Sequence, residues 1–345
     1  MKTHAIIPIF IPHEGCPNDC VFCNQRIITA RTKPPQKEDI IDMIDRYLKT
    51  ISNRGIETVE IAFFGGSFTG IPIEQQTEYL SIARKYKEDG FIHKIHLSTR
   101  PDYIDENILS NLKKHDVDII ELGVQSFDEE VLHLSKRGHC SEIVYQSSRL
   151  IKDYGFELGL QLMIGLPGDT HEKSVASARE AVKIDPSIAR IYPTVIIQDT
   201  ELYRLYQQGK YAPLATEEAV RTAKDMYLIL KGAGINVIRI GLKSSDYINE
   251  GGDTAGGTFH PAFRQLVESE IAKEQLESQI KPMLEKGADQ IIFISNGAFM
   301  SNMIGNRKSN RIYFEKKYPH VRFTFHVDFS LPDDAYRAQA AFLHS

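Results

Sequence analysis

The chain has 345 residues, 42% of them hydrophobic and 25% charged, an ordinary globular composition with room for one large domain and a small one. No apolar stretch approaches the length of a membrane span. The net charge of −5 argues against a protein committed wholly to nucleic acid, although a local basic patch is compatible with an acidic total.

The first apolar run, from Ala5 to Ile11, is interrupted by Pro8 and followed directly by Pro12. No small-residue cleavage site follows it, so the run predicts a buried strand rather than a signal peptide. The expected location is therefore the cytoplasm, whose reducing conditions suit free thiols and oxygen-sensitive groups.

Three cysteines follow this strand at CxxxCxxC spacing: Cys16, Cys20 and Cys23. The residues at 17–19 are Pro, Asn and Asp, which favour turns, so the sulfurs belong to a wrapped loop in which they converge. Thiolates hold iron–sulfur clusters, and such clusters usually take four of them. A group of three therefore indicates a cluster with one iron open to a ligand from outside the protein.

Three other interpretations of these cysteines stay open on the spacing alone. A structural zinc site normally takes four ligands, and the fourth cysteine, Cys140, lies more than a hundred residues away, beside His139. A disulfide framework needs an oxidising compartment, and an inert group of buried thiols does not predict a turn-rich loop. Cys140 is predicted to be a structural thiol, because its position gives no argument for ligation.

Over about the first 240 residues, short apolar runs alternate with longer amphipathic ones, which is typical of repeated βα units and a parallel sheet. The predicted strands are Ile6–Ile11, Val59–Phe64, Lys94–Leu97, Ile119–Val124, Leu158–Ile164 and Arg190–Ile196. We therefore expect an α/β fold, a partial (β/α)6 TIM-like barrel over residues 1–246. A small α/β extension over residues 247–345 completes it.

Glycine and polar residues follow several strands, at the end of the sheet where a parallel barrel gathers its chemistry. Gly65, Gly66 and Ser67 follow the second strand; paired glycines let a ligand approach the backbone, although they also form plain turns. Ser98 follows the third strand and Gln125 the fourth, positions that also suit caps of the next helices.

With Phe22 directly before its last cysteine, the CxxxCxxC motif resembles the signature of the radical S-adenosylmethionine (SAM) enzymes. The resemblance implies a 4Fe-4S cluster on the three cysteines, with its open iron chelating SAM. An electron from a donor such as ferredoxin or flavodoxin then cleaves SAM to methionine and a 5′-deoxyadenosyl radical, which abstracts a substrate hydrogen. The resemblance also implies that a set of residues in the cysteine loop and in or after the strands contacts SAM: Phe22, Gly65, Gly66, Ser67, Ser98, Gln125, Arg137 and Gln161.

Arg137 has a second interpretation. Its planar guanidinium suits a carboxylate such as that of SAM, but a solvated surface charge is equally compatible with the sequence.

Several segments up to Asp246 resemble the radical domain of the Elongator catalytic subunit family, which modifies the wobble uridine of transfer RNA (tRNA). They are residues 98–103, 121–126, 136–139, 165–168, 191–194, 200–203 and 209–211. This resemblance implies a tRNA base as substrate, with Tyr192 near it as the candidate catalytic residue. The later residues lack the glycine-rich Arg/Gln-x-x-Gly-x-Gly/Ala pattern of that family's acetyltransferase domain, so an acetyl-coenzyme A step is not implied. Oxygen-independent coproporphyrinogen oxidase is a more distant match.

The tail begins with the glycine-rich residues 249–260, which predict a lid, a substrate loop or a plain linker. A helix over residues 261–284 and strands at 290–294 and 321–327 follow. The helix between those strands presents either an RNA-binding face or a solvated surface through Asn302, Arg307, Lys308, Arg311, Lys316 and Lys317.

Three functions remain open from the sequence. The favoured one is radical SAM modification of a tRNA base; the others are radical SAM chemistry on a small molecule and a non-catalytic iron–sulfur scaffold or redox sensor.

Overall fold

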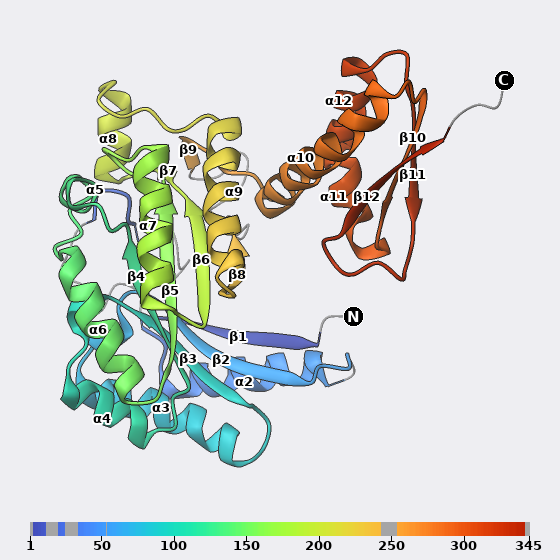
Figure 1. Cartoon of the computed structure of the whole chain (residues 1–345). Helices are drawn as coiled ribbons and strands as arrows, with labels where there is room; N and C mark the ends of the chain where they lie inside the picture. The colour runs from blue at the N-terminus through green and yellow to red at the C-terminus, as the bar shows by residue number, and fades with distance from the viewer. Residues whose placement is uncertain (1–2, 12–19, 25–33, 53, 243–253, 342–345) are drawn as a thin grey trace. The chain divides into compact units, whose positions relative to one another are not determined.

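The structure is a computed structural model that describes residues 3–11, 20–24, 34–52, 54–242 and 254–341 (Figure 1). It divides into two compact units. The barrel unit comprises Met1–Ala215 and Met226–Pro261, and the C-terminal unit comprises Thr216–Asp225 and Ala262–Ser345. The predicted domain boundary at residue 246 lies outside the described residues.

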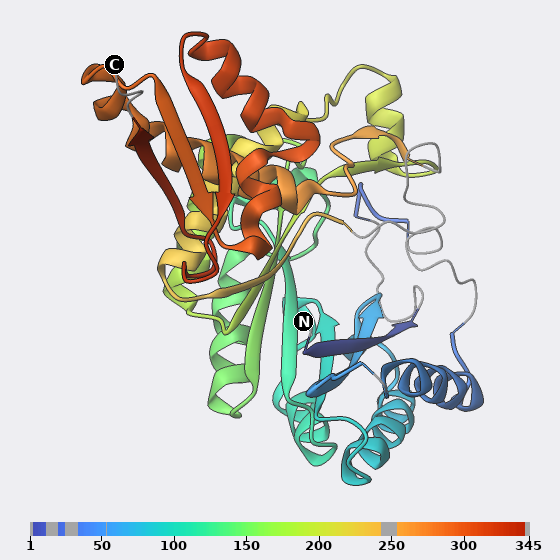
Figure 2. The ribbon, with the colours of Figure 1, turned by 90° about the vertical axis from the view of Figure 1, so that its right-hand side faces the viewer.

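The barrel unit is built on a parallel sheet of seven strands in the order β1-β2-β3-β4-β5-β6-β8. Figure 2 shows how this sheet curls into a partial barrel. Its strands are β1 (His4–Ile11), β2 (Thr58–Gly65), β3 (Lys94–Thr99), β4 (Ile119–Gln125), β5 (Glu157–Ile164), β6 (Ile188–Pro193) and β8 (Asn236–Ile240). The predicted fold class and its six strands are confirmed, and β8 adds a seventh strand that the sequence analysis did not include.

One predicted strand is divided in two. The run expected to continue to Ile196 ends its sheet pairing at Pro193, which has no backbone N–H to donate. The chain resumes as β7 (Val195–Ile197), which pairs antiparallel with β9 (Thr254–Gly257) in a separate two-stranded sheet. Part of the predicted glycine-rich loop is therefore a strand, and residues 249–253 of that loop lie outside the described part.

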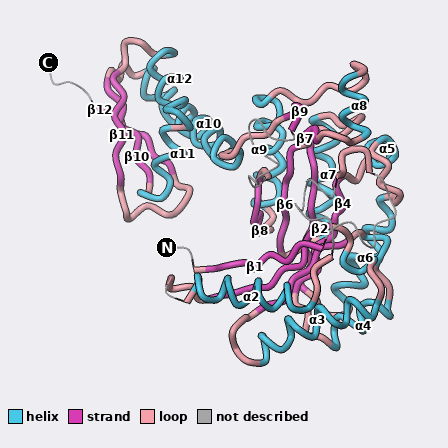
Figure 3. Tube along the Cα trace, turned by 180° about the vertical axis from the view of Figure 1, so that it is seen from behind, coloured by secondary structure: helices cyan, strands magenta, loops and turns pink. Residues whose placement is uncertain are grey.

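Helices cover the outer face of the barrel sheet, as Figure 3 shows. They are α2 (Lys37–Ile51), α3 (Ile73–Glu88), α4 (Glu106–Lys114), α5 (Glu129–Leu134), α6 (Ser141–Asp153) and α7 (His171–Ile184). Of the other two helices, α8 (Glu201–Gln207) contacts β7, and α9 (Thr216–Gly232) is divided between the two units. Four of these helices begin at a side chain that accepts a backbone N–H bond, namely Asp105, Asp128, Thr170 and Thr200. Each such cap stabilises its helix by about 1 kcal/mol.

Alternate residues of the strands face the helices and the barrel interior. The helix-facing set is apolar and fully buried; Phe63 of β2, for example, stacks on Tyr79 of α3 with ring centroids 6.5 Å apart. Burying each such side chain contributes about 1.5–3 kcal/mol. The interior-facing set includes charged and polar residues, which form the site described below.

The C-terminal unit has its own sheet, in which β10 (Gln290–Ser295) pairs parallel with β11 (Arg322–Val327) and antiparallel with β12 (Tyr336–Ala341). The long helix α10 (Phe263–Glu285) and the short helices α11 (Met300–Ile304) and α12 (Ser309–Lys317) complete it. Phe293, Phe314 and Phe323 meet in its core, with ring centroids 4.8–5.6 Å apart. The predicted α/β character and both predicted strands are confirmed; β12, whose apolar residues are mostly alanine, was missed.

The predicted cation-rich helix of this unit is not one helix. It breaks between α11 and α12, where Gly305, Arg307 and Lys308 all have positive φ angles. Its expected face is also partly neutralised, because Arg311 pairs with Glu315 at 2.8 Å and Lys317 with Glu277 at 2.5 Å. Asn302 is buried and donates to Glu268 at 2.9 Å.

None of the helices in the described residues has the length and apolar character that a membrane span requires.

Candidate active site

The carboxyl ends of the barrel strands bring several of the predicted site residues to one edge and one face of the sheet. By strand register, Gln161 of β5 lies beside Gly123 of β4 and Arg190 of β6, and Tyr192 lies beside Met163. Gln161 donates to the side-chain oxygen of Gln125 at 3.3 Å. Two residues that lie 36 positions apart in the sequence are thus in contact, as a shared ligand site requires.

The described part of the cysteine loop is held against two other segments of the same edge. Cys20 is buried and the backbone N–H of Cys23 donates to its carbonyl at 2.9 Å, so the loop turns between these cysteines. Val21 donates to the carbonyl of Ser135 at 3.2 Å and accepts from the N–H of Leu202 in α8 at 2.7 Å. Cys16 lies outside the described residues.

Phe22 packs beside Val21, whose backbone is bonded to Ser135 and Leu202. It is partly buried against an apolar cluster made by Val21, Ile196 and Leu202. The aromatic residue of the motif therefore stabilises the loop in this structure, and its predicted SAM contact stays a prediction.

Arg137 lies directly against the cysteine loop. Its guanidinium is buried, with 6% of the residue exposed, so the interpretation as a solvated surface charge is wrong. Nη1 lies 3.2 Å from the Sγ of Cys20, and Nη2 donates to the carbonyl of Gly123 in β4 at 2.5 Å. The buried Nε has no acceptor among the described residues. This arginine therefore joins the cysteine loop to the edge of the sheet and keeps donor capacity for a ligand.

The glycine that ends β2 is required by the backbone. Gly65 has a φ of +117°, and a Cβ at this position would lie 2.3 Å from the carbonyl oxygen of Ile11. Gly66 donates its N–H to that same oxygen at 3.0 Å. Only glycine allows β1 and β2 to meet this closely at their ends. The following Ser67 is buried.

Neither Ser98 nor Gln125 caps a helix. The helices after them begin at Arg100, Asp105 and Asp128 instead. Gln125 has a φ of +71°, an uncommon backbone state for a residue with a side chain, and such states cluster at ligand sites. The alternative of simple helix capping is therefore wrong for both residues.

Charged residues that the sequence analysis did not single out form a buried network of side chains across the barrel interior. Glu60 of β2 contacts His96 of β3 at 2.6 Å, and His96 faces Glu121 of β4 at 3.5 Å. Arg190 of β6 donates from Nε to Glu121 at 2.6 Å. All four are at most 6% exposed. A charged residue inside an apolar strand was the sequence signal, and the period of two places each of them on the interior face.

The contact between Glu121 and Arg190 crosses β5, where Gly159 pairs with Glu121 of β4 and with Ile188 of β6. A Cβ on this glycine would lie 3.2 Å from the Cβ of Glu121 and 2.9 Å from Ile188. Without a side chain there, residues of β4 and β6 reach each other over the intervening strand.

The contacts within this charged network favour the charged forms of its members. Burial opposes the charged form of His96, but the neighbouring carboxyl groups of Glu121 and Glu60 outweigh burial and raise its pKa. Burial likewise opposes ionisation of Glu121, but the charge of Arg190 and the bond to His96 lower its pKa. Two carboxyl groups, an imidazole and a guanidinium therefore meet in the interior, and the contacts among them favour their charged forms.

Tyr192 lies beside Arg190, the last member of this charged network. Arg190 donates from Nη1 to its phenol oxygen at 3.2 Å. Because a guanidinium can only donate, the tyrosine oxygen accepts here, and its O–H is directed elsewhere. Burial raises the pKa of Tyr192, so the phenol keeps its proton at neutral pH.

Comparison with known proteins identifies the family. A model described as "Radical SAM superfamily" matches residues 10–181, and one described as "Radical_SAM C-terminal domain" matches residues 186–273, which together are about three quarters of the chain. The chain belongs to the radical SAM superfamily. This is the family that the cysteine motif predicts, and its members are enzymes.

Individual relatives within the superfamily agree with the narrower resemblance. The chain is 28% identical over 254 residues to "tRNA uridine(34) acetyltransferase" of Methanocaldococcus jannaschii, which is 63% of this chain and 47% of that protein. It is 29% identical over 264 residues to "Elongator complex protein 3" of Homo sapiens, again 63% of this chain and 47% of that protein. The chain thus spans about half the length of the curated relatives it matches.

A solved structure supports the fold. The archaeal Methanocaldococcus infernus Elp3 with an N-terminal deletion superposes with a TM-score of 0.64 at 23% identity, over 80% of this chain and 64% of that chain.

The residues present fit the cofactors of a radical SAM enzyme. Cys20 and Cys23 offer soft sulfur ligands, and the buried guanidinium of Arg137 lies against Cys20 with an Nε that has no acceptor among the described residues. Cys140 is exposed at the start of α6. No group of three metal-binding side chains occurs among the described residues, which exclude Cys16.

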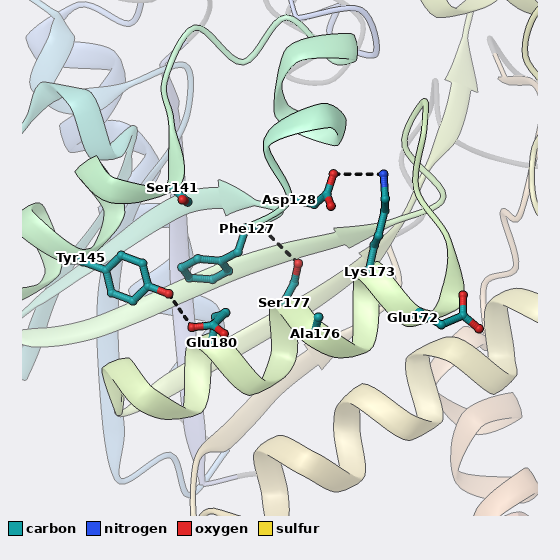
Figure 4. Close-up of a pocket in the computed structure, with 9 residues that line it drawn as sticks. All are labelled: Phe127, Asp128, Ser141, Tyr145, Glu172, Lys173, Ala176, Ser177 and Glu180. Carbon is teal, nitrogen blue, oxygen red and sulfur yellow. Dashed lines mark hydrogen bonds and ion pairs between the residues drawn. The ribbon is translucent and has the colours of Figure 1, made fainter.

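A cavity of about 530 Å³ lies elsewhere, on the outer helices of this radical SAM barrel (Figure 4). Its polar side chains bind one another: Asp128 pairs with Lys173 at 3.1 Å, and Tyr145 donates to Glu180 at 2.6 Å. None of the predicted site residues lines it. These contacts join the start of α5 and the helix α6 to α7 and assign the cavity to helix packing.

Proposed function

We propose that this protein binds a 4Fe-4S cluster through Cys16, Cys20 and Cys23 and cleaves SAM reductively at that cluster. The single observation that carries the proposal is the docking of the Cys20 turn onto the carboxyl edge of the sheet, with the Arg137 guanidinium 3.2 Å from the Cys20 sulfur. A buried cation beside a thiol suits an anionic, metal-binding sulfur.

The residues around this edge are proposed to hold SAM. The backbone at Gly65, Gly66 and Ser67 is proposed to receive the amino group, and the Nε of Arg137, which has no acceptor among the described residues, is proposed to donate to the carboxylate. Further contacts are proposed for Phe22, Ser98, Gln125 and Gln161.

Bound SAM and cluster would supply the 5′-deoxyadenosyl radical, and the chain itself supplies position and polarity. Tyr192 is proposed to lie next to the substrate, with its O–H directed away from Arg190. The charged network of Glu60, His96, Glu121 and Arg190 behind it makes the barrel interior polar. Such an interior suits a substrate rich in hydrogen-bonding groups, such as a nucleobase.

For the substrate we propose a base in tRNA. The support is the similarity to a tRNA uridine(34) acetyltransferase and the resemblance of residues 191–194 to the Elongator catalytic subunit family. An acyl donor forms no part of the proposal. A reducing protein such as ferredoxin or flavodoxin is the proposed electron donor, and the cytoplasm the proposed location.

The first experiment tests the radical chemistry. Protein reconstituted without air with iron and sulfide, then given SAM and a strong reductant, should release 5′-deoxyadenosine. Cys20→Ala should lose most of the iron and the product, whereas Cys140→Ala, a matched control at an exposed cysteine, should keep both. A fully loaded cluster that yields no 5′-deoxyadenosine would favour the scaffold or redox sensor.

The second experiment tests the substrate. Modified nucleosides in total tRNA from cells with and without this gene are compared by mass spectrometry, and the proposal expects at least one to disappear. Unchanged tRNA combined with 5′-deoxyadenosine release would favour radical chemistry on a small molecule.

A further inference from the structure

Arg137 contacts a sulfur that is proposed to ligate the cluster, which gives this arginine a role separate from SAM binding. We infer that Arg137 raises the reduction potential of the cluster by donating a hydrogen bond to the Cys20 thiolate. The inference rests on the proposed function, because it requires Cys20 to be a cluster ligand.

The position of the guanidinium is fixed at both of its terminal nitrogens. Nη1 lies 3.2 Å from Cys20 Sγ while Nη2 is bonded to the carbonyl of Gly123, a residue within β4. Since the guanidinium is planar and rigid, these two contacts set its orientation. The sulfur therefore faces a donor whose place is determined by the sheet.

The backbone of Arg137 is held independently. Its carbonyl accepts a bond from Arg100 Nη2 at 2.5 Å, and Arg100 is itself bound by both oxygens of Asp102 at 2.8 and 2.9 Å. Arg100 is 3% exposed. Two residues earlier, Ser135 accepts the N–H of Val21. The segment thus binds the cysteine loop through a backbone bond and a side-chain bond, so the contact with Cys20 is a built feature.

A donor and a positive charge at this distance favour the reduced cluster. Reduction adds one negative charge, and a buried cation stabilises that charge more strongly than a hydrated one would. Hydrogen bonds to the sulfurs and nearby charge are established determinants of iron–sulfur potentials. A guanidinium keeps its charge at every accessible pH. Because its Nε has no acceptor among the described residues, Arg137 can hold a SAM carboxylate while still bonded to Cys20.

The test measures cluster potential without SAM. The full-length protein and three variants are reconstituted without air, iron and sulfide are counted per chain, and the clusters are titrated potentiometrically with detection by electron paramagnetic resonance. Arg137→Gln removes the charge, and Arg137→Lys keeps it. Lys136→Gln is the matched control, because it removes a charge from the neighbouring residue, whose side chain is exposed and pairs with Glu201 at 2.6 Å.

The expected result is that Arg137→Gln shifts the potential to a more negative value or lowers the iron content, that Arg137→Lys lies closer to wild type, and that Lys136→Gln matches wild type. Wild-type iron content together with a wild-type potential in Arg137→Gln overturns the inference and leaves the proposed function standing. Equal iron loss in Arg137→Gln and Lys136→Gln also overturns it. A wild-type protein that assembles no cluster overturns the proposed function itself.

Discussion

Replacing Glu121 by Gln tests the charge balance of the barrel interior. Glu121 is 1% exposed and accepts from Arg190 at 2.6 Å. Arg190 cannot lose its proton, so the substitution leaves a buried guanidinium without its counter-charge. Removing one partner of a buried ion pair costs about 3–5 kcal/mol. At roughly 3 °C per kcal/mol for a domain of this size, the melting temperature should fall by roughly 10 °C.

A matched control exists in the same sheet. Glu157 of β5 pairs with Lys94 at 2.5 Å, but both side chains are more than a third exposed. Glu157→Gln should therefore cost about 1 kcal/mol at most, because solvent screens exposed pairs. The two variants carry the same chemical change and differ in burial.

The assay is thermal and urea unfolding of both variants and of the double variant Glu121→Gln with Arg190→Met. Removing both partners eliminates the uncompensated charge, so the double variant should be less destabilised than the sum of the single variants by about 1–3 kcal/mol. Equal stability of Glu121→Gln and Glu157→Gln, or simple additivity in the double variant, would refute the reasoning.

Three further predictions can be tested. The pKa of His96 is raised in the folded protein, so its stabilising effect is complete below the unfolded pKa of 6.5 and declines as pH rises through the folded pKa. In urea titrations, the loss of unfolding free energy caused by His96→Gln should therefore shrink between pH 6 and 9, and a loss that grows over this range would contradict the prediction. Gly65→Ala should destabilise the protein by about 3 kcal/mol or more, because the new Cβ overlaps the carbonyl oxygen of Ile11 and φ is positive. Gly90 has a φ of +78° but no atom within 4 Å of an added Cβ, so the control Gly90→Ala should cost about 1–2 kcal/mol. Similar melting temperatures of the two variants would contradict this prediction. If tRNA is the substrate, its binding measured by filter retention should weaken steeply with salt, and salt-independent binding would favour a small molecule.

Much of the barrel was predictable because its strands are short apolar runs separated by amphipathic helices. The strand β8 was missed because Arg239 interrupts its apolar residues, and β12 because Arg337 and Gln339 alternate with small residues. The division of the sixth strand at Pro193 was visible in the sequence only as a single proline.

The candidate site was predictable where a motif has local spacing, as for Cys20 and Cys23. The alternatives for Ser98, Gln125 and Arg137 could not be decided locally, because helix capping and burial depend on neighbours distant in the chain. Seen singly in the sequence, Glu121 and Arg190 looked like isolated charges within apolar strands.

By itself, the sequence determined the family, the alternation of strands and helices and the thiols near its start, because each depends on residues close together in the chain. Only the tertiary structure decided that Arg137 meets a cysteine sulfur 117 positions before it and that Glu121 meets Arg190 over a glycine. The reason is that such contacts are set by strand register and barrel curvature, which bring together residues from separate βα units.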